Sequence, residues 1–123
     1  MKPHREFFQI DEDRWQPQEG YPEGFEVQIL VDDLDPVLRT GSRTVLQRIA
    51  PGAFTHGQLV HEEAEEVFLW QGDLVVGGDA EGHGAEHFYA PAYACRPGGV
   101  PHGPFRSESG CLMLAVFYYA NGA

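Results

Sequence analysis

Three side chains of the types that bind divalent metals, His61, Glu65 and His102, stand in a chain with many short β-prone segments. Two imidazoles and one carboxylate form the ligand set of non-haem Fe(II) oxygenases, which leaves coordination positions open for substrate and O2. The same set completed by water suits Zn(II). The three residues therefore predict a divalent metal centre, with Fe, Zn, Mn and Ni as candidate ions.

Side chains alternate along a strand, and this alternation selects Glu65 rather than Glu66 as the carboxylate ligand. Residues of equal parity face the same way. If the chain from His61 to Leu69 forms one nearly continuous strand, His61 and Glu65 both point into the core. Val67 then completes the inward face. A buried carboxylate is more stable with a cation beside it than without one, which agrees with a metal at Glu65.

The same alternation places Phe68 and Trp70 on the outer face of the strand. Two large aromatic side chains exposed on one face form an apolar patch, and such patches usually mark an interface. We therefore expect a homodimer that buries Phe68 and Trp70.

His102 follows the segment Pro97-Gly98-Gly99-Val100-Pro101. Glycines permit a tight turn and prolines stiffen it. We expect this turn to aim His102 into the interior, at the start of a strand.

Leu59 stands where a further ligand on the face of His61 would be expected. His56 has the opposite parity, so it would reach the metal only if the chain bulges between His56 and Leu59. The ligand set is therefore three residues, with His56 as a conditional fourth. A site that holds no metal remains the alternative.

Three further residues are candidates for contact with a substrate. Phe105 and Tyr93 are expected to line the interior with ordinary core residues. Arg96 would pair with a substrate carboxylate if it faces inward, although an outward arginine is the commoner arrangement.

The elements that must position these residues are short strands. Turn residues separate the segments, and none shows a helical apolar period, which predicts an antiparallel all-β sandwich or barrel. The predicted strands span residues 25–31, 43–50, 58–61, 65–70, 73–76, 87–90, 93–96 and 111–119.

Residues 1–24 are rich in proline, glycine and charge and predict an arm that lies over the domain or reaches a neighbour. Residues 25–123 predict a single domain.

Length and charge limit the classes of partner. The 123 residues suffice for one domain, and the formal net charge of -11 repels nucleic acid and anionic membranes. No apolar run approaches the roughly 20 residues needed to cross a bilayer. The N-terminal residues lack the apolar segment of a secretory signal. We expect a cytoplasmic protein whose partner is a small molecule.

In its motifs the chain resembles the cupins, an RmlC-like superfamily. The first cupin motif has two histidines followed by a glutamate and a glycine, and here His61, Glu65 and Gly72 match it, while Leu59 replaces the first histidine. The second motif is matched by Pro97-x-Gly99 and His102, with Arg106 where asparagine is usual. The resemblance implies a double-stranded β-helix, or jelly-roll, cupin barrel with a metal site in its interior.

Two branches of the cupins are similar in further segments. Residues 76–82 and 89–93 resemble acetylacetone dioxygenases, and residues 102–111 resemble the ChrR group of cupin domains. The dioxygenase branch uses three histidines, whereas this chain offers two histidines and a glutamate. The first resemblance implies a dioxygenase-like oxidoreductase acting on a small dicarbonyl or enolisable molecule.

The second resemblance implies a different class of function. A ChrR-like cupin would sense or bind a ligand without catalysis, with Zn or no metal. A cofactor-free isomerase or epimerase that uses a histidine as general base is a third hypothesis.

Overall fold

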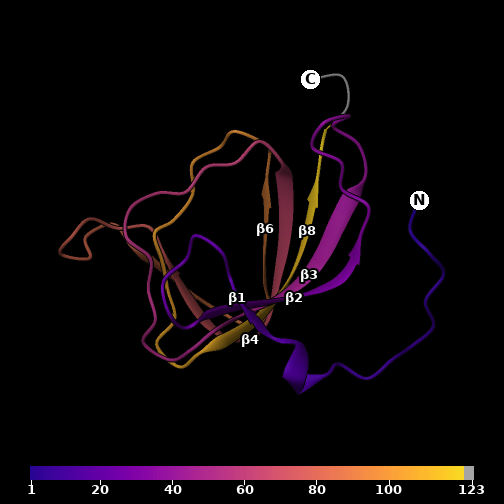
Figure 1. Ribbon diagram of the computed structural model, residues 1–123. Helices are drawn as coiled ribbons and strands as arrows, with labels where there is room; N and C mark the ends of the chain where they lie inside the picture. Colours follow the sequence, from indigo (N-terminus) through magenta and orange to yellow (C-terminus); the bar gives the residue numbers. More distant parts are fainter. Residues whose placement is uncertain (121–123) are drawn as a thin grey trace.

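The computed structural model describes residues 1–120, so the end of the predicted domain, residues 121–123, lies outside the described residues. Strands that pair antiparallel form a curved sheet with one core (Figure 1). The strands are β1 (Gln16–Pro17), β2 (Phe25–Asp32), β3 (Ser42–Ile49), β4 (Ala64–Val76), β5 (Glu86–Tyr89), β6 (Ala92–Arg96), β7 (Phe105–Arg106) and β8 (Cys111–Tyr118). The all-β prediction is confirmed. Among the described residues no helix is long and apolar enough to span a membrane.

β4 is the longest strand and joins the two halves of the barrel. Its N-terminal part pairs with β6 and β8, and its C-terminal end pairs with β5 and β7. The pairing with β8 shifts between Leu69 and Gln71, and Gly72 follows with a φ of 86°. A Cβ at Gly72 would lie 1.9 Å from the carbonyl oxygen of Gly110, so glycine is required there. Two strands predicted separately are therefore one strand that bends at a bulge.

Alternation along β4 decides which side chains reach the core. Glu65, Val67 and Leu69 are buried, whereas Phe68 is 43% exposed and Trp70 is 40% exposed. The predicted assignment of these residues to an inner and an outer face is confirmed. The core that the inner face joins consists of Phe25, Val45, Ile49, Val67, Leu69, Leu74, Cys111, Met113 and Ala115.

His61 does not lie on this strand. β4 begins at Ala64, so the nearly continuous strand from His61 to Leu69 on which the parity argument depended does not form. His61 instead belongs to the loop before β4, where its Nδ1 lies 2.8 Å from the carbonyl oxygen of Glu63. The imidazole turns back along the chain and reaches the interior from the barrel end.

The strand predicted over 58–61 is also wrong, because only one residue pair forms there. Leu59 and His102 make an isolated antiparallel bridge. His102 therefore stands on this bridge and precedes the next strand, β7, rather than beginning it.

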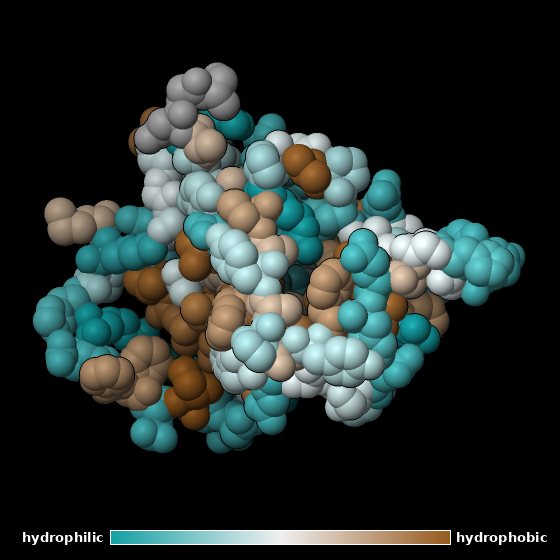
Figure 2. Space-filling view, turned by 180° about the vertical axis from the view of Figure 1, so that it is seen from behind, coloured by the Kyte–Doolittle hydropathy of each residue, from teal (hydrophilic) through white to brown (hydrophobic). Residues whose placement is uncertain are grey.

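The N-terminal arm lies along its own domain, over β2 and β3. Gln28 Nε2 donates to the carbonyl oxygen of Asp11 at 3.2 Å. Arg48 Nη1 lies 3.0 Å from Glu12 Oε2, and the guanidinium carbon of Arg48 lies 4.3 Å from the ring centroid of Trp15. Figure 1 shows the arm in indigo on the β2 side of the barrel. Figure 2 shows the molecule from behind, where hydrophobic residues gather on one half of the face and hydrophilic residues surround them. The arm covers the outer face of β2 and β3.

Candidate metal centre

The three predicted ligands meet at one end of the barrel. Glu65 Oε1 lies 3.7 Å from His61 Nε2 and 3.9 Å from His102 Nε2. One potential ligand atom from each residue lies within 4.8 Å of the other two. The two imidazole rings meet edge to face, with 4.9 Å between their centroids. These separations allow one cation to contact all three side chains after small rotations.

Backbone carbonyl groups fix which nitrogen of each imidazole faces the site. His61 Nδ1 lies 2.8 Å from the carbonyl oxygen of Glu63, and His102 Nδ1 lies 3.1 Å from that of Val100. A carbonyl oxygen only accepts hydrogen bonds, so each Nδ1 carries the proton. Each Nε2 then presents a lone pair toward Glu65. Metal-binding histidines are commonly oriented in this way.

The turn before His102 packs directly on the loop that carries His61. Gly99 N donates to the carbonyl oxygen of His61 at 2.8 Å. A Cβ at Gly98 would lie 1.9 Å from the carbonyl oxygen of Glu62, so a larger residue would push the two segments apart. The glycines of this turn thus bring His61 and His102 side by side.

Glu65 is held in the interior by a cross-strand partner. It is 5% exposed and stands opposite Arg96 in the register of β4 and β6. Directly opposite residues project to the same face of a sheet. Arg96 Nη1 donates to Glu65 Oε1 at 3.1 Å, and this ion pair offsets the buried negative charge.

The two histidines differ in basicity. The hydrogen-bonded carboxylate of Glu65 raises the pKa of His61, although partial burial opposes the rise. Burial lowers the pKa of His102. The carboxylate of Glu65 therefore favours positive charge at His61, whereas burial and the nearby charge of Arg96 favour the neutral imidazole of His102, the form that binds a metal.

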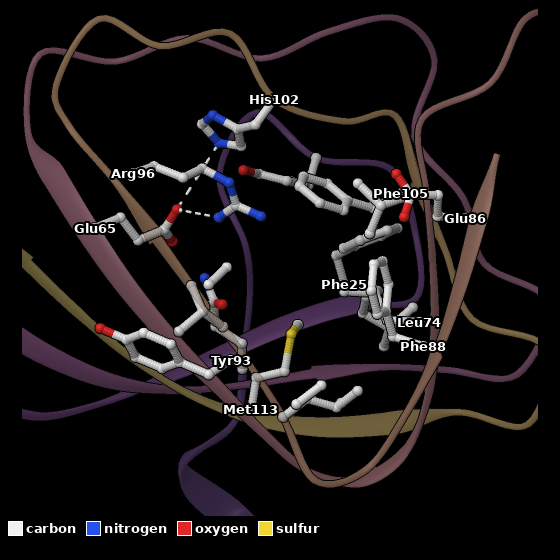
Figure 3. Close-up of a pocket in the computed structure, with 18 of the residues that line it drawn as sticks. Phe25, Glu65, Leu74, Glu86, Phe88, Tyr93, Arg96, His102, Phe105 and Met113 are labelled. Carbon is white, nitrogen blue, oxygen red and sulfur yellow. Dashed lines mark hydrogen bonds and ion pairs between the residues drawn. The ribbon is translucent and has the colours of Figure 1, made fainter. Parts of the chain in front are cut away.

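A cavity of about 240 Å³ extends from this cluster into the barrel. Figure 3 shows Glu65, Arg96 and His102 gathered on one side, and the apolar side chains of Phe25, Leu74 and Phe88 on the other with the carboxylate of Glu86 near them. A small molecule in the cavity would therefore meet apolar walls along its body and polar groups at one end.

The three candidates for substrate contact lie differently. Phe105 lines the cavity and packs against the ring of His102, with 5.7 Å between centroids. Arg96 faces the cavity, so the commoner outward arrangement does not apply to it. Tyr93 adjoins the cavity, but it is 61% exposed and its hydroxyl donates to Glu66, so its side chain turns outward.

His56 lies away from the cluster. It is exposed, and its ring packs edge-on against Phe54 at 5.0 Å between centroids. The neighbouring Thr55 is buried instead, and its Oγ1 accepts a hydrogen bond from Phe105 N at 2.8 Å. The three-residue set, without His56, is the one that the structure brings together.

Several residues of the cavity wall carried no functional prediction. Gln18 and Tyr21 come from the arm, which sequence patterns gave no reason to place near the site. Burial and then the charge of Glu65 raise the pKa of Tyr21. Gln47 shares the inner face of β3 with Ile49, so strand parity could have indicated it.

The residues present suit a divalent cation. Two neutral imidazole nitrogens and a buried carboxylate oxygen match the donor preference of Fe(II), Zn(II) and related ions. The orientation of both imidazoles by carbonyl groups supports the same conclusion. No described side chain takes the place of the histidine that Leu59 replaces, so three protein ligands are available.

Comparison with solved structures places the fold among the cupins. The acetylacetone dioxygenase from Acinetobacter johnsonii is 24% identical with a TM-score of 0.70, over 94% of this chain and 75% of that one. An RmlC-like cupin from Shewanella frigidimarina is 19% identical with a TM-score of 0.64, over 96% and 95%. The polyketide cyclase RemF from Streptomyces resistomycificus is 17% identical with a TM-score of 0.67, over 96% and 83%.

These TM-scores support a shared fold and confirm the predicted RmlC-like cupin barrel. A search of curated protein sequences finds no match. The family model for the ChrR cupin-like domain matches residues 3–120, which include the arm as well as the barrel. The chain therefore belongs to the ChrR cupin-like domain family.

Proposed function

We propose that this cupin is a metal-dependent oxidoreductase of the dioxygenase type, acting on a small dicarbonyl or enolisable molecule. One observation carries the proposal: the potential ligand atoms of His61, Glu65 and His102 converge at the polar end of an apolar cavity. Similar folds include the acetylacetone dioxygenase from Acinetobacter johnsonii, which supports the same class of reaction.

The roles of the residues follow from their positions. His61, Glu65 and His102 would hold the divalent ion, which supplies a Lewis acid for enolate oxygens and a position for O2. Phe105 and the apolar wall would exclude water from the bound substrate. Both oxygen atoms of O2 would enter the products as one carbon–carbon bond breaks. The four electrons come from the substrate, so no external reductant is needed.

The proposal is tested by loading the metal-free protein with Fe(II) under anaerobic conditions and measuring O2 consumption with a panel of β-diketones and other enols. We expect consumption of one O2 per substrate molecule. Glu65→Gln removes a ligand and should abolish it. Glu66→Gln changes the neighbouring, outward-facing carboxylate and should leave it intact. No consumption by the Fe(II)-loaded protein across the panel would refute the proposal.

A second function is favoured by the ion pair between Arg96 and Glu65. Because Arg96 already offsets the charge of Glu65, this buried carboxylate does not need a metal to balance it, which suits a non-catalytic cupin that binds or senses a small ligand. Elemental analysis of protein purified without chelators separates the two functions. Stoichiometric Fe, Mn or Ni supports catalysis, whereas protein that is free of metal and binds a ligand supports sensing.

A further inference from the structure

Arg96 and a bound metal would need the same oxygen atom. Arg96 Nη1 lies 3.1 Å from Glu65 Oε1, the atom that both imidazole Nε2 atoms face. We propose that metal binding releases Arg96 from Glu65, and that the freed guanidinium binds the carboxylate of an otherwise apolar ligand in the cavity. This inference rests on the metal centre of the proposed function and names the class of its ligand.

Charge makes the exchange necessary. A divalent ion coordinated by Glu65 Oε1 would stand within a few ångströms of the guanidinium, and two cations repel strongly in a partly buried site. Arg96 is always protonated, so it cannot relieve the repulsion by losing a proton. Its side chain is 17% exposed, so it is not held at the surface by solvent. This repulsion favours movement of the guanidinium when the metal binds.

The cavity wall offers Arg96 a second partner. While it pairs with Glu65, its guanidinium carbon already lies 5.5 Å from the ring centroid of Phe105, which forms part of that wall. When an arginine stacks on an aromatic ring, its N–H donors point outward in the plane of the guanidinium and remain free to bind a ligand. Figure 3 shows Arg96 and Phe105 side by side at the polar end of the cavity. From there the N–H groups would face a ligand carboxylate.

The remaining wall defines the rest of the ligand. Most other lining side chains are apolar, but Glu86 also lines the cavity and would repel a second carboxylate. The net charge of -11 disfavours polyanions in general. The expected ligand is therefore a monocarboxylate with an apolar body, whose binding improves when the metal is bound.

The first test titrates Zn(II) into metal-free wild type, Arg96→Met and Arg96→Lys by calorimetry. We expect Arg96→Met to bind Zn(II) at least about 10-fold more tightly than wild type, because the competing charge is gone. Arg96→Lys keeps the charge without the planar fork and should lie between them. Arg106→Met removes an equal charge from an exposed position, so it measures the effect of net charge alone.

The second test compares cinnamate with the uncharged cinnamamide as probes. In wild type, Zn(II) should raise the affinity for cinnamate at least about 5-fold and leave cinnamamide nearly unchanged, as expected for two coupled sites. Zinc-loaded Arg96→Met should lose most of the preference for cinnamate. If that variant keeps the preference in full, the carboxylate binds the metal and the role of Arg96 is overturned.

The outcomes separate this inference from the proposed function. Equal Zn(II) affinity in wild type, Arg96→Met and Arg106→Met would overturn the exchange and leave the metal centre standing. Zn(II) binding by none of the variants would overturn the metal centre and the exchange together. Circular dichroism and thermal melting show whether each variant is folded, and Arg96→Lys keeps the test decisive if Arg96→Met does not fold.

Discussion

Leu59 and His102 face each other across a single antiparallel bridge. Leu59 N donates to the carbonyl oxygen of His102 at 2.7 Å, and His102 N donates to that of Leu59 at 2.8 Å. Opposed residues of such a pair project to the same side, with Cβ atoms roughly 5 Å apart. The residue in the position of the first motif histidine is therefore already beside the metal centre.

Leu59→His should consequently add a fourth ligand without changing the backbone. We expect the affinity for Zn(II) to rise at least about 10-fold, because one more imidazole would coordinate the ion. The matched control is Val60→His, since Val60 is 64% exposed and its side chain has the opposite parity. Calorimetric titration of both variants decides the point. A folded Leu59→His variant with unchanged affinity would show that this side chain does not reach the metal.

Gly98 fixes the distance between the two histidine segments. Gly98→Ala should lower the affinity for Zn(II) by about 10-fold, since a Cβ there would collide with the carbonyl oxygen of Glu62 and move His102 away from His61. Gly98 does not have a positive φ, so the effect is steric rather than conformational. Val100→Ala, at a 40% exposed position of the same turn, is the control and should leave affinity unchanged. Equal affinities for the two variants would contradict the steric role of this turn.

Much of the candidate site could be predicted because it depends on local rules. Strand parity separated Glu65 from Glu66, and the proline and glycine residues before His102 indicated a turn that aims one side chain. The motif around Gly72 indicated a tight turn, although the structure has a bulge within one strand. Each of these features is determined within a few residues.

The features that could not be predicted depend on contacts between distant segments. The pairing of Arg96 with Glu65 depends on the register of β6 against β4, which the sequence does not reveal. The prediction for Arg96 therefore relied on the general preference of arginine side chains for solvent, and it favoured an outward orientation. His61 joins the site from a loop rather than from the predicted strand. The turn before His102 packs on this loop, where Gly99 N donates to the carbonyl oxygen of His61. Tyr21 reaches the cavity only because the arm folds along its own domain.

Asp73 anchors the loop before β8 to the bulge in β4. Its carboxylate accepts hydrogen bonds from the backbone and hydroxyl of Ser109, from Ser107 Oγ, from Glu108 N and from His87 Nε2, the last at 2.6 Å. Burial alone would raise the pKa of Asp73, but these donors outweigh it and hold the pKa well below its usual range. The buried carboxylate therefore stabilises the fold in its ionised form.

Asp73→Asn should lower the free energy of unfolding by about 2–3 kcal/mol at neutral pH, because several charge-assisted hydrogen bonds are weakened or lost. The folded pKa lies below the unfolded value of about 3.9, so the stabilisation is complete above that pH and fades as the pH falls below it. The difference between wild type and variant should therefore shrink in acid. Urea denaturation at several pH values measures it, with Asp79→Asn in an exposed loop as the control. A pH-independent difference would contradict this account.

Self-association through the outer face of β4 stays a prediction. Phe68 stands opposite Tyr93 on β6 and Leu114 on β8, and the arm covers β2 and β3 but not this aromatic patch. Burial of Phe68 and Trp70 against a second copy of the chain would remove their exposed aromatic surface from water.

We expect sedimentation velocity to show a dimer for the wild type and a monomer for the double variant Phe68→Ser, Trp70→Ser. Val37→Ser, at an 88% exposed position outside the patch, should remain dimeric. A wild-type protein that stays monomeric at high concentration would refute this interface, and a double variant that stays dimeric would place the contact elsewhere.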